Sequence, residues 1–177
     1  MKARESLSTP VLVMNIVSFQ AGWFACVLGA ARGWGWQGPL SVLAIAGAWL
    51  LVAPRPGALA LLYALTGIVG LCWDSWLALL GLIGYAPGPL SPPLAPLWIL
   101  ALWVLFATTL QVSLRWLRGR PWLGGVLGAI LAPLAYLGAA RLGALELLQP
   151  GPALLAQAAA WALLLPALVV LARHCDA

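Results

Sequence analysis

Six apolar stretches, separated by short segments rich in glycine and proline, make up most of the chain. Residues 38–39, 54–56 and 150–152 mark three of the breaks, where proline and glycine interrupt helices. A helix needs about 20 apolar residues to cross the hydrocarbon of a bilayer. The pattern therefore predicts an all-α fold, a polytopic six-helix transmembrane bundle with short loops and spans at about 10–31, 38–53, 57–84, 95–114, 121–140 and 152–172.

Composition supports this interpretation. The chain has 177 residues, of which 64% are hydrophobic and only 7% are charged. A soluble globular domain is excluded, because it would lack the polar groups to cover its surface. At about 20 residues per span, six spans also leave no room for a separate soluble domain. We expect one transmembrane domain over residues 1–177, surrounded by membrane lipids.

The net charge of +5 does not indicate nucleic-acid binding, because the basic residues stand singly at span ends. Placed on alternate sides of the membrane, they predict that both termini are cytoplasmic. Asn15 and Gln20 interrupt the first apolar run, which favours a retained span over a cleaved signal peptide. Abundant Ala, Leu and Arg are typical of GC-rich bacterial genes and indicate a bacterial inner membrane. The cytoplasmic side would carry Lys2, Arg4, Arg55, Arg115, Arg118, Arg120 and Arg173, against Arg32 and Arg141 outside.

The third apolar stretch contains an acidic residue, Asp74, deep inside it. Placing an ionisable group in hydrocarbon costs at least ~2.5–3.5 kcal/mol, so such a group normally has a buried partner or a function. Arg141, whose long side chain can reach inward from the outer end of the fifth stretch, is the expected partner. The pair would either pin two helices together or handle a ligand or proton. The sequence leaves open whether Asp74 is ion-paired or protonated.

A second group of polar residues lies toward the cytoplasmic side. The fourth stretch carries Thr109, Gln111 and Ser113, and the first carries Asn15 and Gln20 at comparable depths. These side chains either line a shared polar cavity or serve structure, since Thr and Ser can bond to their own helix and an amide can tether a neighbour. For Thr109 and Ser113 the structural interpretation is favoured.

Four tryptophans lie deeper than the predicted span ends: Trp23, Trp73, Trp76 and Trp103. Each indole N–H needs an acceptor, and each ring offers a plane for a flat or apolar ligand. Ordinary core packing is the favoured interpretation.

Small residues recur at four-residue spacing, which lets helix backbones approach closely in lipid. Packing within the chain is favoured over a homodimer seam or the docking of a partner membrane subunit. The two ridges are Ala21, Ala25 and Gly29 in the first stretch, and Gly124, Gly128 and Ala132 in the fifth.

Recognisable catalytic chemistry is missing from the sequence. His174 is the single histidine, and the three cysteines lack the paired spacing of a disulfide framework or zinc site. No phosphate loop or dinucleotide fingerprint occurs. We therefore expect no metal and no cofactor, and binding, passage or scaffolding rather than classical catalysis.

Several stretches resemble an uncharacterised bacterial family of small inner-membrane proteins, domain of unknown function 2878. They are NIVSFQAGWFACVLG at 15–29, CWDSWLALLG at 72–81, PLWILALWVLFATTLQVSLRWL at 96–117 and PLAYLGAARLGA at 133–144. The resemblance implies a polytopic bacterial membrane protein and brings no established activity. Its polar motif positions become candidate ligand-binding residues: Asn15, Gln20, Trp23, Asp74, Thr109, Ser113, Trp116, Tyr136 and Arg141.

The function we expect is binding, moving or presenting a small amphiphilic or lipid-like molecule in an intramembrane polar cavity lined by helices one, three, four and five. Asp74 and Arg141 would form an outer gate or clamp, and Asn15, Gln20 and Gln111 the inner polar lining. Two alternatives stay open. One is a membrane enzyme or accessory factor of lipid metabolism, and the other is a structural or assembly subunit of a membrane complex.

Overall fold

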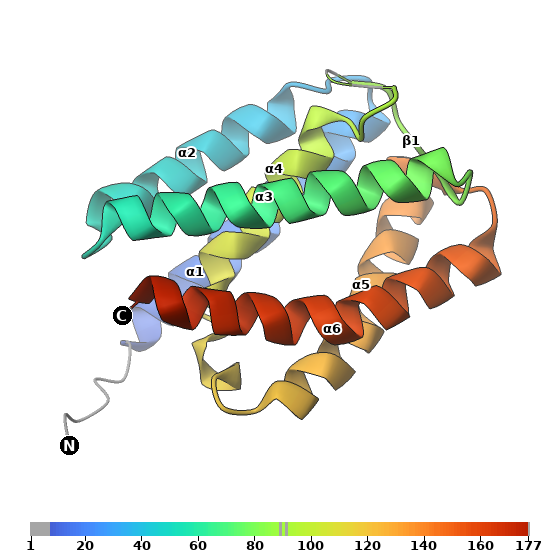
Figure 1. Cartoon of the computed structure of the whole chain (residues 1–177). Coiled ribbons are helices and arrows are strands. Elements are labelled where there is room, and N and C mark those ends of the chain that lie inside the picture. Colours follow the sequence, from blue (N-terminus) through green and yellow to red (C-terminus); the bar gives the residue numbers. More distant parts are fainter. Residues whose placement is uncertain (1–7, 89, 91, 177) are drawn as a thin grey trace.

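The computed structural model describes residues 8–88, 90 and 92–176. Lys2 and Arg4, which contributed to the predicted topology, lie outside these residues. The predicted all-α fold with six main helices is confirmed (Figure 1). The helices are α1 (Thr9–Ala31), α2 (Gln37–Val52), α3 (Pro56–Leu79), α4 (Leu97–Leu110), α5 (Pro121–Arg141) and α6 (Pro150–Asp176), with a 3-10 turn, η1 (Arg115–Leu117), and two short strands, β1 (Ile83–Tyr85) and β2 (Leu145–Leu147).

Among the described residues, four helices are long and apolar enough to cross a membrane: α1, α3, α5 and α6. The other two, α2 and α4, are apolar but have 16 and 14 residues. They fall short of the length that a full span requires. The expectation of six full spans is therefore reduced to four spans and two shorter apolar helices.

Three predicted helix ends are wrong by several residues. The last helix, α6, continues to Asp176, four residues beyond its predicted end. The third helix ends at Leu79, because Gly81 adopts a left-handed backbone with φ of 63° that cannot continue a helix. The chain then enters β1, which pairs antiparallel with β2, so that Tyr85 lies opposite Leu145. The fourth helix ends at Leu110 and passes through turns into η1, which leaves Ser113 outside it.

The helices pack in two groups. In the first group, α4 packs against α1, α2 and α3. In the second group, α5 packs on α6, and α6 joins the pair to α3. Trp73 of α3 supports this junction, since its Nε1–H donates to Gln157 Oε1 of α6 at 3.1 Å. In contrast, α1 and α5 scarcely touch.

The glycine ridge of α5 packs within the chain. A Cβ atom at Gly128 would lie 2.1 Å from the backbone oxygen of Trp161, and one at Gly125 would lie 3.0 Å from that of Ala162. Pro166 of α6 has no N–H to donate to the Ala162 carbonyl one turn earlier. This carbonyl lies against the glycine-lined face of α5. Glycine is therefore required where the two backbones meet. The other ridge is not one packing surface, since Ala21 is exposed while Gly29 is buried.

Candidate functional site

Asp74 lies on the buried face of α3 with no exposed surface, and its carboxylate accepts three side-chain hydrogen bonds. The hydroxyls of Tyr85 and Tyr136 each donate to Oδ1 at 2.5 Å. The indole Nε1–H of Trp103 donates to Oδ2 at 2.6 Å. Donors at both oxygens satisfy the carboxyl group, which compensates part of the cost of burying it. We refer to these four residues as the Asp74 cluster.

The local sequence explains how three elements reach one carboxylate. Gly70 precedes Asp74 by one helical turn, on the same face of α3. A Cβ atom at Gly70 would lie 1.9 Å from the Trp103 ring, so glycine alone lets the indole lie flat against the helix and reach Asp74. The neighbouring Ser75 accepts from the backbone N–H of Ala95 at 2.8 Å and fixes the entry to α4.

The predicted Asp74–Arg141 ion pair is wrong for the part of the chain that the structure describes. Arg141 is exposed at the last residue of α5. The α5 side chain that reaches Asp74 is Tyr136, more than one turn earlier. Arg32 is also exposed, with its guanidinium carbon 6.0 Å from the centroid of the Trp34 ring. Phenol and indole donors thus replace the expected guanidinium.

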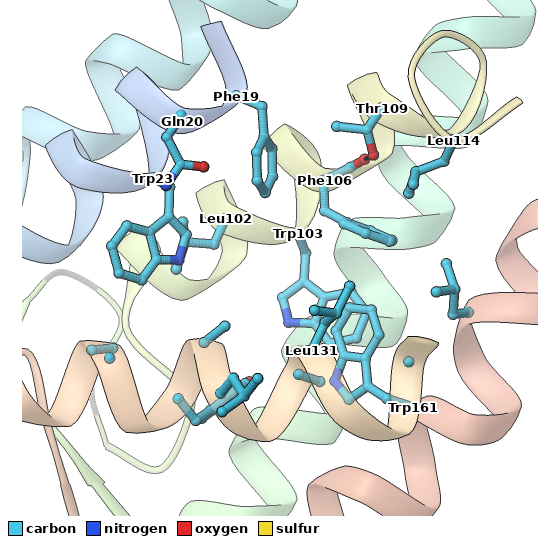
Figure 2. A pocket seen from close by; sticks show the side chains of 18 of the residues that line it. Phe19, Gln20, Trp23, Leu102, Trp103, Phe106, Thr109, Leu114, Leu131 and Trp161 are labelled. Atoms are coloured by element: carbon cyan, nitrogen blue, oxygen red, sulfur yellow. Dashed lines mark hydrogen bonds between the residues drawn. The ribbon is translucent and has the colours of Figure 1, made fainter. Parts of the chain in front are cut away.

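Next to the Asp74 cluster is a cavity of about 550 Å³, which we call the aromatic cavity. It lies between α1, α4, α5 and α6, and Figure 2 shows the side chains that gather around it. Trp103 stacks on Trp161 with ring centroids 4.8 Å apart, and Phe106 meets Trp161 edge-on at 5.1 Å. Trp103 and Tyr136 belong to both the cavity wall and the Asp74 cluster. Asp74 is therefore one hydrogen bond away from the cavity wall.

The aromatic cavity reaches the outer surface of the protein. Three large apolar residues of its lining are more than half exposed: Ile16 of α1 at 54%, and Leu131 and Leu134 of α5 at 55% and 56%. These apolar side chains lie on the two helices that scarcely touch. The cavity therefore opens between the sides of α1 and α5, where apolar side chains are exposed, and not at a helix end.

One protein family matches this chain over residues 12–167, and its description is a protein of unknown function, DUF2878. The chain belongs to the DUF2878 family. No curated protein and no solved structure matches it. The resemblance drawn from the sequence is therefore confirmed, and the match spans all the candidate residues of this DUF2878 protein, from Asn15 to Arg141.

The structure brings five of the ten candidate residues of the DUF2878 protein to the aromatic cavity and leaves five outside it. The Thr109 hydroxyl donates to its own helix, at Phe106 O, 2.6 Å away. Asp74 lies behind the wall, whereas Arg141, the half-buried Gln111 and the exposed Trp116 are not part of the lining. The five lining residues are Gln20, Trp23, Thr109, Ser113 and Tyr136.

Asn15 has a structural position instead of a place in the cavity. Its Nδ2 donates to Thr108 O at 3.1 Å, and its Oδ1 accepts from the backbone N–H of Ser113 at 3.3 Å. The last carbonyls of a helix lack partners within the helix. Asn15 therefore holds the end of α4 to α1 in this DUF2878 protein.

Sequence reasoning missed Tyr85 and Trp161, and gave Trp103 no specific partner. The need of a deep indole N–H for an acceptor was a usable signal for Trp103. Tyr85 lies in a strand that the apolar pattern concealed, and Trp161 looked like one more residue of the last span. The cavity of the DUF2878 protein is accordingly lined by α6 rather than α3.

Proposed function

We propose that this protein binds one small amphiphilic, lipid-like molecule in the aromatic cavity, to move or present it. The observation that carries the proposal is a 550 Å³ space whose wall is mainly aromatic and aliphatic, with a few polar side chains among them. Cavities of this size and character hold small organic ligands in many proteins. The apolar part of the ligand would lie along Phe19, Phe106 and Leu131.

The polar end of the ligand would lie at Tyr136. Tyr136 lines the cavity and its hydroxyl is already bonded to Asp74, so a ligand group that bonds to this hydroxyl would be coupled to the buried carboxylate. The other polar lining residues are Gln20 of α1, Thr109 near the end of α4 and Ser113 just beyond that end. Entry would be sideways from the bilayer, because Ile16, Leu131 and Leu134, which line the cavity and are exposed on the sides of α1 and α5, are apolar.

Native mass spectrometry of the full chain in mild detergent tests the proposal. We expect one discrete small-molecule mass to copurify with the wild-type protein. The variant Leu131→Trp fills the cavity mouth and should lose this mass. Its control is Ile130→Trp, since Ile130 is the next residue on α5, is 52% exposed and does not line the cavity.

Two results would oppose binding in this cavity. One is a wild-type protein that carries no small molecule, and the other is equal retention by both tryptophan variants. A stoichiometric protein partner in place of a small molecule would favour the assembly-subunit alternative. Turnover of the bound molecule, lost in Asp74→Asn without loss of binding, would favour an enzyme of lipid metabolism.

The location that we propose is a bacterial inner membrane, with both termini cytoplasmic. Arg55 and Arg120 precede α3 and α5, and Arg173 lies in the last turn of α6, so these arginines share one end of the helices. Positive charge is enriched on the cytoplasmic side of such membranes. A C-terminal fusion to alkaline phosphatase, active only outside the cytoplasm, should be inactive. An active fusion would mean that the C-terminus lies outside the cytoplasm and that the proposed topology is inverted.

A further inference from the structure

A second, smaller pocket of about 220 Å³ lies far from the Asp74 cluster, at the other end of α5. It is formed where α5 begins and α6 ends. Most of its lining is apolar and includes Leu117, Val169 and Val170, which we call the floor. Arg120 and Arg173 complete the lining, and both are exposed. The pocket therefore combines two cations with an apolar floor.

The chain geometry directs the two arginines to this pocket. Gly119 adopts a left-handed backbone with φ of 83°, which turns the chain from η1 into α5 and places Arg120 at the start of the helix. Arg120 makes no side-chain hydrogen bond to cap α5. Arg173 lies in the last turn of α6, and none of the nine lining residues is acidic. The two positive charges are thus not neutralised within the pocket lining.

The chemistry of the pocket fits one class of ligand. Guanidinium groups bind phosphate oxygens with paired, charge-assisted hydrogen bonds. Basic pockets between membrane helices at the cytoplasmic side suit anionic headgroups. A phospholipid also places apolar carbon directly beside its phosphate, which matches a floor of leucine and valine. We propose that Arg120 and Arg173 bind the phosphate group of an anionic phospholipid in this pocket.

Lipid titration with native mass spectrometry tests this assignment. We expect the detergent-solubilised full chain to take up one phosphatidylglycerol more readily than phosphatidylcholine. The double variant Arg120→Gln/Arg173→Gln should weaken the phosphatidylglycerol complex by about thirtyfold, since each basic residue near the headgroup contributes a factor of about five. The variant Arg120→Lys/Arg173→Lys keeps both charges and should retain most of the binding.

The matched control is Arg32→Gln/Arg141→Gln, which removes the same charge from exposed residues at the C-terminal ends of α1 and α5. This control should bind phosphatidylglycerol like the wild type. Leu131→Trp should also bind phosphatidylglycerol like the wild type. Because this variant blocks only the aromatic cavity, it distinguishes binding at the two sites. Equal losses in both double glutamine variants, or equal uptake of the two lipids, would overturn the proposal.

Inorganic phosphate distinguishes a lipid from a free anion. If the ligand is a lipid, millimolar phosphate should leave the phosphatidylglycerol complex in place, because inorganic phosphate lacks the apolar part that contacts the floor. Displacement of the lipid by phosphate, with a phosphate adduct in its stead, would overturn the lipid assignment. Melting curves in detergent verify that each variant is folded.

Discussion

Asp74 and Asn15 are two polar side chains that the fold buries completely, and they differ in what holds them. Both Asn15 partners are backbone groups, at the end of α4 and just beyond it. All the hydrogen-bond partners given above for Asp74 are side chains, and two of them also line the aromatic cavity. A backbone partner fixes the position of a helix. Side-chain partners have torsions of their own, so we propose that the Asp74 cluster, unlike the Asn15 contacts, responds to the proposed ligand.

The largest effect is expected for Asp74→Ala. The substitution leaves the two phenols and the Trp103 indole without their acceptor, at a position with no exposed surface. We expect a loss of about 3 kcal/mol in the free energy of unfolding, measured by denaturation in mixed micelles. The copurified ligand should be lost as well.

Asp74→Asn is the matched control for this change. The amide keeps the shape of the side chain and one acceptor oxygen, so its cost in stability should be less than half that of alanine. Equal stability of Asp74→Ala and wild type would show that the three donors find other acceptors and that the carboxylate does not hold them.

An intermediate effect is expected for Asn15→Leu, on stability alone. The change leaves Thr108 O and the Ser113 N–H without their side-chain partner, at a cost of about 2 kcal/mol. Ligand occupancy in native mass spectra should stay at the wild-type level. Gln20→Leu, an exposed amide of the same helix that lines the cavity, should show the reverse: normal stability and reduced occupancy. Loss of ligand in Asn15→Leu would contradict the distinction between the two regions.

A smaller effect should separate the two tyrosines within the Asp74 cluster. Tyr85→Phe and Tyr136→Phe each remove one donor to the same carboxylate oxygen, and each should cost about 1 kcal/mol in unfolding free energy. Only Tyr136 lines the cavity, so only Tyr136→Phe should reduce the amount of bound ligand. Equal occupancy in the two variants would show that the ligand does not contact the Tyr136 hydroxyl.

The same two regions show how far sequence reasoning reaches. The helices follow from apolar runs and from proline and glycine breaks, and Asp74 stands out because a carboxylate in such a run is costly. Its partners do not follow, because Tyr85 and Tyr136 are 11 and 62 residues away and only the packing of α5 and β1 brings them together. Charge complementarity favoured Arg141, but the fold leaves that side chain at the exposed end of α5.

The smallest effect is expected for Arg141→Gln, and it tests that correction directly. Because Asp74 is held by Tyr85, Trp103 and Tyr136, removing the Arg141 charge should change the free energy of unfolding by less than about 0.5 kcal/mol. Ligand occupancy should also be unchanged. A loss comparable to that of Asp74→Asn would mean that the guanidinium reaches the carboxylate in the membrane. The donors of the Asp74 cluster would then share the carboxylate with a cation. Asp74 and the uncharged Asn15 would in that case differ in the charge of their partners rather than in the mobility of those partners.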